Sequence, residues 1–142
     1  MTKSLKCEIV SAEEGIFSGD IERIVATGHM GELGILPGHA PLLTELKPGP
    51  VRVIHDGGRE EDYYVSGGFL EVQPDVVTIL ADSAVRAHDI DEASAEEARQ
   101  HALKALNDKS AELDYTRATA ELAEAVAQLR TIQQLRKKAG KG

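Results

Sequence analysis

Serine and carboxylate side chains are the first candidates for chemistry in this sequence. A nucleophilic serine of the hydrolase type requires Gly-x-Ser-x-Gly, and the nearest run is Val65-Ser66-Gly67-Gly68. A bulge or turn between strands explains its glycines better. The acidic run Glu60-Glu61-Asp62 follows a turn signal, which predicts a solvated flank of a hairpin rather than an acid–base pair in a cleft. The sequence therefore predicts no catalytic residue.

The glycines, histidines and cysteine give no indication of a phosphate, metal or redox site. Gly28, Gly31 and Gly34 recur at every third position, which is neither a dinucleotide fingerprint nor a phosphate loop. The histidines are scattered without the close spacing of zinc ligands, and the single cysteine, Cys7, is expected to be a buried thiol in a reducing compartment. We therefore expect neither a metal nor a cofactor.

The segment from Gly31 to Pro41 is the most distinctive in the chain. Its glycines and two prolines, Pro37 and Pro41, should restrict its shape, and His39 would be displayed near its tip. A rigid, presented loop of this kind predicts a binding role. A plain connection between two strands would also explain the glycines and prolines, although it would not require Glu32 or His39.

Composition divides the chain into two unlike parts. All 5 prolines and eleven of the 13 glycines lie between Gly15 and Pro74. The formal charge of −8 comes almost wholly from residues 1–88, which carry 7 basic and 14 acidic side chains, whereas residues 89–142 carry 9 and 10. An acidic chain without a basic stripe is unsuited to nucleic acid, and no apolar run is long enough to span a membrane. The opening residues are charged, so we expect no secretory signal.

Short apolar runs separated by turn residues fill residues 1–85. They are rich in β-branched side chains, and Asp56-Gly57-Gly58 and Pro74-Asp75 mark turns between them. This pattern predicts an antiparallel β-sandwich of about ten strands. The clearest runs are Leu5 to Ile9, Ile21 to Ala26, Leu33 to Leu36, Val51 to Ile54, Tyr63 to Val65, Phe69 to Val72 and Val76 to Leu80.

Residues 86–142 have a helical period and predict an antiparallel two-helix hairpin. Asp91 or Ser94 can cap the first helix, with Ser94 to Glu97 as a capping box. A turn over Asn107 to Ser110 leads to a second helix, expected from Ala111 to Lys138. The predicted seam of the first helix is Ala95, Ala98, Ala102 and Ala105, and that of the second is Ala111, Tyr115, Ala118, Leu122, Ala125, Leu129 and Ile132.

Alanine dominates both predicted seams. An alanine methyl buries little area, whereas a buried leucine contributes roughly 1.5–3 kcal/mol. The hairpin is therefore expected to dock weakly and to be a candidate switch element, with a static helical appendage as the alternative. The end of the second helix carries Arg130, Arg136, Lys137 and Lys138 without nearby acids, and such a basic run is usually solvated.

Several motifs follow one another in a recognisable order. They are the run Gly31 to Thr44, then Tyr64 to Val72, Val77 to Asp82, Asp114-Tyr115 and Ala120 to Ala123. In this order they resemble the epsilon subunits of bacterial F-type ATP synthases over nearly the whole chain. The resemblance implies a non-catalytic subunit of the central stalk, with the sandwich against the gamma subunit and on the membrane rotor ring.

The resemblance also implies the partners and their surfaces. Gly31, Glu32, Pro37, His39 and Pro41 would be candidates for the contact with the rotor ring of c subunits and with gamma. The C-terminal helices would extend into the alpha/beta catalytic head and inhibit ATP hydrolysis. Contact with the membrane would be indirect, on the cytoplasmic face of the bacterial inner membrane, in a proton-translocating enzyme.

Two groups of residues acquire more specific roles from the resemblance. The basic residues Arg130, Arg136, Lys137 and Lys138 would face an acidic segment of the catalytic beta subunit. Some family members bind ATP on the hairpin through Ile/Leu-Asp-x-x-Arg-Ala, and the matching run here is Ile90-Asp91-Glu92-Ala93-Ser94-Ala95.

Serine at the arginine position of that motif cannot supply a bidentate charge to phosphate. ATP sensing should therefore be weak or absent unless Arg99 substitutes, so Asp91 and Arg99 are only weak candidates for nucleotide contact. The alternative function is a soluble ATP-sensing protein, or an adaptor with a coiled-coil arm.

Overall fold

The structure is a computed structural model, and it describes residues 4–107 and 112–141, with the side chains of residues 112–115 and 138–141 left out of the description. The described ranges hold a strand-rich part followed by two helices, as the sequence predicts. The elements are β1 (Leu5–Ser11), β2 (Gly15–Ile21), β3 (Arg23–Gly28), β4 (Gly31–Ile35), β5 (Leu42–Leu46), β6 (Gly49–Ile54), β7 (Glu60–Val65), β8 (Gly68–Val72), β9 (Val76–Ala81), β10 (Ala84–Arg86), the 3-10 turn η1 (Ala87–Asp89), α1 (Glu92–Asn107) and α2 (Glu112–Lys141).

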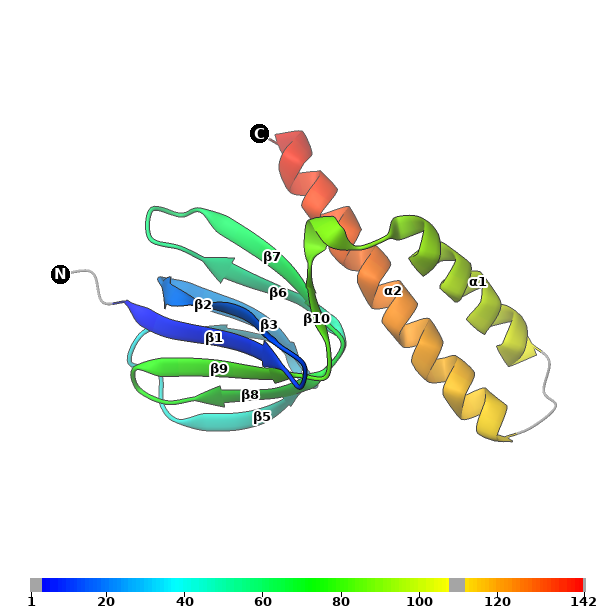
Figure 1. Cartoon of the computed structure of the whole chain (residues 1–142), viewed down its shortest axis with the longest axis horizontal. Helices are drawn as coiled ribbons and strands as arrows, with labels where there is room; N and C mark the ends of the chain where they lie inside the picture. Colours follow the sequence, from blue (N-terminus) through cyan, green and yellow to red (C-terminus); the bar gives the residue numbers. More distant parts are fainter. Residues whose placement is uncertain (1–3, 108–111, 142) are drawn as a thin grey trace.

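The strands form one sheet that curls into a sandwich, with the helices beside it (Figure 1). Its order is β10-β7-β6-β3-β5-β8-β9-β1-β2, and β4 pairs with β3. The pairing of β1 with β9 is parallel, and the other pairings are antiparallel as predicted. A parallel pair needs a long crossover, and the strands between β1 and β9 supply it.

Alternating apolar side chains build the core between the two layers. In β1, Leu5, Cys7 and Ile9 are at most 1% exposed, and in β9 Val77 and Ile79 are fully buried beside them. The core cluster and the apolar side chains packed against it are drawn only from residues 5–84. The sandwich therefore has a hydrophobic core of its own.

The glycine pair at the β7–β8 turn is required by a close approach of two backbones. Gly68 has a φ of +136°, and a Cβ at this position would lie 2.1 Å from the carbonyl oxygen of Leu80. In the same turn, the Ser66 hydroxyl lies 2.7 Å from the Ser83 hydroxyl and accepts a hydrogen bond from the backbone N–H of Ser83. Ser66 thus closes the turn, in agreement with the structural interpretation of this motif.

The first helix begins at one of its two predicted caps, and the predicted start of the second, Ala111, lies outside the described residues. Asp91 caps α1, because its Oδ1 accepts a hydrogen bond from the backbone N–H of Ser94 at 3.1 Å. Ser94 lies inside the helix and donates its hydroxyl to Asp91, so the predicted capping box beginning at Ser94 is wrong. The predicted turn falls largely on residues 108–111, outside the described residues. Within those residues, neither helix has both the length and the apolar character needed to cross a bilayer.

Two sides of α2 are buried. Ala118, Ala125 and Ile132 repeat every seven residues on the side that packs against α1, as the seam predicts. Ala127 and Thr131 form a second buried stripe, which the sequence did not reveal. Positions 125 and 127 point in nearly opposite directions on a helix. Since α2 also packs on β6 and β7, this second stripe faces the sandwich.

The seam of α1 is narrower than predicted. Ala95 and Ala102 are buried, at 2% and 0% exposed, but Ala98 is exposed and Ala105 is only half-buried. Ala111 of the second predicted seam lies outside the described residues, as does the side chain of Tyr115. On the α1 side, the buried part of the contact between the helices therefore consists of two alanine methyl groups.

A polar cluster around Glu61 holds the joint between the sandwich and the helices. The Glu61 carboxylate accepts hydrogen bonds from Tyr63 Oη at 2.9 Å, Arg86 Nη1 at 2.9 Å and Arg59 Nη1 at 3.0 Å. His55 Nε2 lies 2.9 Å from its Oε1, a charge contact without hydrogen-bond geometry. Arg86 ends β10 and immediately precedes η1, so Glu61 fixes the point at which the helices leave. The prediction that this acidic run is merely solvated is wrong for Glu61.

Substitution of Gly68 tests the close approach of the turn. Gly68→Ala should lower the free energy of unfolding by about 2 kcal/mol or more, because the added methyl overlaps the Leu80 carbonyl and the positive φ is strained. Gly34→Ala is the matched control, since its Cβ meets no atom within 4 Å. Urea unfolding followed by circular dichroism measures both. Equal midpoints for the two variants would contradict the packing described here.

The Glu61 cluster predicts a pH dependence. Partial burial raises the pKa of the Glu61 carboxyl, but hydrogen bonds from Tyr63 and Arg86, the charge of His55 and the hydrogen bond from Arg59 together lower it below its usual 4.5. A lowered native pKa stabilises the fold above the unfolded pKa, and this contribution is lost as pH falls through the native value. Glu61→Gln should therefore destabilise the protein at pH 7, and the difference should vanish in acid. Unfolding free energies from pH 7 to pH 3 check this, and a constant difference would contradict it.

Candidate interaction surfaces

The segment from Gly31 to Pro41 is not one loop. Gly31 to Ile35 forms β4, which pairs with β3, and only residues 36–41 connect strands. The Gly31 end of β4 lies with the β5–β6 turn, whereas Pro37, His39 and Pro41 lie at the opposite end of the sandwich. Five strand residues at about 3.3 Å each separate the two sets by roughly 16 Å. The expectation of a single presented loop is therefore wrong.

Each half of that segment has local partners. Glu32 Oε2 lies 3.7 Å from Arg52 Nη2, and the Glu32 side chain remains 62% exposed. His39 is half-buried, and its Nδ1 lies 2.7 Å from the carbonyl oxygen of Ala40. The backbone N–H of Gly38 donates to the carbonyl of Pro74 in the β8–β9 turn. The backbone beside His39 is thus tied to the sandwich, and the half-buried His39 side chain contacts its own neighbour in the chain.

An exposed apolar strip crosses four neighbouring strands. Leu43, Phe69 and Leu80 are 67%, 50% and 48% exposed. Across the strands, Phe69 of β8 pairs with Leu80 of β9, and Leu80 pairs with Val10 of β1. Leu43 of β5 pairs with Glu71, two residues after Phe69, so Leu43 and Phe69 are diagonal neighbours. We call Val10, Leu43, Phe69 and Leu80 the apolar strip. Contiguous exposed apolar side chains of this kind mark interaction sites.

Acidic side chains border the apolar strip. Glu45 pairs across the strands with Phe69, and Glu71 pairs with Leu43. Glu8 follows on β1, where Lys6 Nζ lies 3.6 Å from its carboxylate. A partner with apolar side chains flanked by basic ones would complement this surface. The sequence carried a sign of this strip. Leu70 and Ile79 point into the core, so their neighbours Phe69 and Leu80 must point outward, and both are apolar.

The basic residues at the end of α2 do not share one environment. Arg136 makes a bidentate ion pair with Glu92 of α1, so the statement that acids are absent nearby is wrong for this residue. Arg130 and Lys137 are exposed. The side chain of Lys138 lies outside the described residues. Folding of the hairpin, rather than sequence proximity, brings Glu92 to Arg136.

The two weak candidates for nucleotide contact are both engaged by neighbours. Hydrogen bonds from the backbone and hydroxyl of Ser94 lower the pKa of Asp91, which caps α1. Arg99 Nε donates to both oxygens of Glu96 at 3.2 Å. A groove of about 480 Å³ nevertheless places Arg99 and Arg130 on one side of the hairpin. Arg99 would have to leave Glu96 to bind phosphate, and the expectation of weak nucleotide binding stays a prediction.

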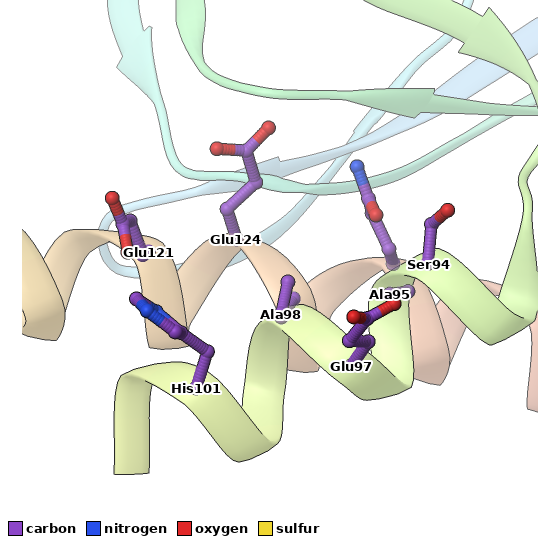
Figure 2. A pocket seen from close by; sticks show the side chains of 9 residues that line it. Ser94, Ala95, Glu97, Ala98, His101, Glu121 and Glu124 are labelled. Carbon is purple, nitrogen blue, oxygen red and sulfur yellow. The ribbon is translucent and has the colours of Figure 1, made fainter. Parts of the chain in front are cut away.

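Another groove between the helices, of about 520 Å³, is acidic (Figure 2). Glu97 and His101 line it from α1, and Glu121 and Glu124 line it from α2. Its three carboxylates disfavour an anionic ligand such as a nucleotide. Within the described residues no group of three or more potential ligands could hold a metal ion. The surfaces described above therefore suit contacts with other protein chains better than catalysis.

Comparison with known proteins covers nearly the whole chain. The family model described as ATP synthase, Delta/Epsilon chain, beta-sandwich domain matches residues 4–87, and the model of its long alpha-helix domain matches residues 88–133. The chain is 74% identical over 135 residues to the ATP synthase epsilon chain of Chromohalobacter salexigens, covering 95% of this chain and 96% of that one.

Two solved structures share the fold. A chain in the Euglena gracilis mitochondrial ATP synthase, in its OSCP/F1/c-ring assembly, has a TM-score of 0.83 and 24% identity, covering 91% of this chain and 81% of that one. A chain in the central stalk/c-ring structure of the Tetrahymena thermophila mitochondrial ATP synthase has a TM-score of 0.62 and 13% identity, covering 93% and 99%. At these identities the likeness concerns the fold.

Proposed function

This chain belongs to the ATP synthase delta/epsilon chain family, and on that premise we propose that it is a non-catalytic central-stalk subunit of a proton-translocating F-type ATP synthase. Its sandwich would dock on the gamma subunit and on the rotor ring of c subunits. Its helices would reach the alpha/beta head and restrain ATP hydrolysis. The complex would hold the chain peripherally at the cytoplasmic face of the bacterial inner membrane.

The observation that carries the docking role is the apolar strip. It lies on β5, β8, β9 and β1, whereas α2 packs on β6 and β7, so the chain's own helices occupy another part of the sandwich. We assign the strip to the gamma subunit, which would bring apolar side chains flanked by basic ones. The strip extends the contact surface beyond the five residues predicted from the sequence.

The five predicted interface residues divide between the two ends of the sandwich. One end holds Gly31 and Glu32, and the other holds Pro37, His39 and Pro41. A rotor ring seated on one end would contact only one set directly. We propose the Glu32 end for the ring, because Glu32 is exposed there and Met30, at the adjoining turn, is fully exposed.

The helical hairpin supports the regulatory role. α2 has 30 residues, which at 1.5 Å each is about 45 Å of helix. An undocked α2 of that length could extend well beyond the sandwich. Arg130, Arg136, Lys137 and Lys138 would then face acidic side chains of the beta subunit.

The apolar strip predicts a loss of docking on substitution. Phe69→Asp and Leu80→Asp should each weaken retention of the chain in the purified ATP synthase at least about tenfold, because they bury a charge in the interface. Leu103→Asp, on an exposed apolar residue of α1, is the control and should remain bound. Quantitative mass spectrometry of purified complexes measures copies per complex. Retention of both strip variants at one copy would contradict this assignment.

Removal of the helices tests the regulatory role. A chain ending at residue 88 should assemble, because the sandwich core is built only from residues before that point. ATP hydrolysis by the complex should rise severalfold relative to the full-length chain. Unchanged hydrolysis with full assembly would contradict the restraint. Failure of the wild-type chain to co-purify with gamma and the membrane sector would instead favour the soluble sensor or adaptor.

A further inference from the structure

An ion pair joins the N-terminal end of α1 to the C-terminal part of α2. Arg136 Nη1 donates to Glu92 Oε1 at 3.1 Å, and Arg136 Nη2 donates to Glu92 Oε2. The two residues are 44 positions apart in the sequence. Two parallel hydrogen bonds between a guanidinium and a carboxylate form the most directional charge pair that side chains can make. This pair closes the hairpin at the end away from its connecting turn.

Glu92 is also placed where its helix stabilises its charge. Glu92 is the first residue of α1, directly after the Asp91 cap, and the helix dipole favours a carboxylate there. Arg136 lies five residues before the end of α2, on the other helix. The closed hairpin thus brings a cation to a carboxylate that is already favourably placed.

The pair matters because the buried contact between α1 and α2 is shallow on the α1 side. The buried residues of α1 are Ala95 and Ala102, which face the stripe of Ala118, Ala125 and Ile132 on α2. The side chains of Glu92 and Arg136 remain 45% and 64% exposed. An exposed ion pair shifts an equilibrium by only a few fold, so this contact can be exchanged for another.

We propose that Glu92 competes with an acidic partner surface for Arg136. By binding this arginine, Glu92 holds the hairpin closed and keeps Arg136 from that surface until the pair opens. We identify this surface with the catalytic head, and this identification rests on the inhibitory role proposed above. One guanidinium fork cannot satisfy two carboxylates bidentately at once. Closing of the hairpin and engagement of Arg136 by the head are therefore mutually exclusive.

The closed state can be measured in the isolated full chain. Spin labels at two exposed positions, Lys47→Cys in the β5–β6 turn and Lys104→Cys on α1, report the distance between α1 and the sandwich. Because α2 packs on the sandwich, this distance changes when α1 separates from α2. Burial raises the pKa of the remaining thiol, Cys7, to about 12, so that it stays protonated and unlabelled. Double electron–electron resonance then gives the ratio of separated to closed molecules.

Glu92→Gln should raise that ratio about two- to fivefold, because it removes the charge from an exposed ion pair. Glu97→Gln removes the same charge from α1 without breaking a described ion pair, and it should leave the ratio unchanged. The exchanged pair, Glu92→Arg with Arg136→Glu, should return the ratio toward the wild-type value. Equal ratios for Glu92→Gln, Glu97→Gln and the wild type would overturn the proposal.

The same variants in the assembled ATP synthase separate this inference from the inhibitory role. Glu92→Gln should lower ATP hydrolysis about two- to fivefold, since Arg136 is released to the head, and Glu97→Gln should not. The exchanged pair should close the hairpin, and it should not inhibit ATP hydrolysis through position 136, because a glutamate now stands there. If Glu92→Gln opens the isolated chain and hydrolysis is unchanged, the ion pair is supported as the closing contact and the inhibitory role in the proposed function is overturned.

Discussion

The alternation of inward and outward side chains on a sheet folded into two layers is the constraint on which the rest of the molecule depends. Inward residues such as Cys7, Ile9 and Ile79 are fully buried in the core. The parallel pairing of β1 with β9 joins distant parts of the chain and fixes which neighbours share a face. Every outward residue is then assigned to a definite surface, because a shift of one position would exchange the two faces.

Two outward surfaces differ in what covers them. Tyr64 on β7 points away from the core, yet it is only 2% exposed, because α2 packs on β6 and β7. Burial and the charge of Glu124 raise the pKa of Tyr64, and within the described residues its hydroxyl makes no hydrogen bond. A buried hydroxyl without a partner costs about 1–3 kcal/mol. The apolar strip on β5, β8, β9 and β1 is by contrast available to another chain.

The helices combine a firm joint with a loose closure. The Glu61 cluster ties Arg86, the last residue of the sandwich, to Tyr63 and Arg59. Beyond that joint, the contact of α1 with α2 buries mostly alanine side chains, together with Ile132, and an exposed ion pair adds to it. A helix pair attached in this way can separate without disturbing the sandwich core. The same distribution of contacts explains how one subunit can be both a rigid docking body and a candidate regulator.

The sequence alone was enough for the fold class, seven of the strand runs, the seven-residue stripe of α2 and the family, because periodicity, turn residues and local motifs are properties of short segments. It offered Asp91 as one of two caps of α1, and the structure decided between them. The sequence did not show that Gly31 to Pro41 spans the sandwich, that Glu61 gathers four partners, that Arg136 meets Glu92 or that Val10, Leu43, Phe69 and Leu80 adjoin. Those relations join residues far apart in the chain. Only strand pairing and helix packing decide them, because they set register and distance between segments that the sequence leaves independent.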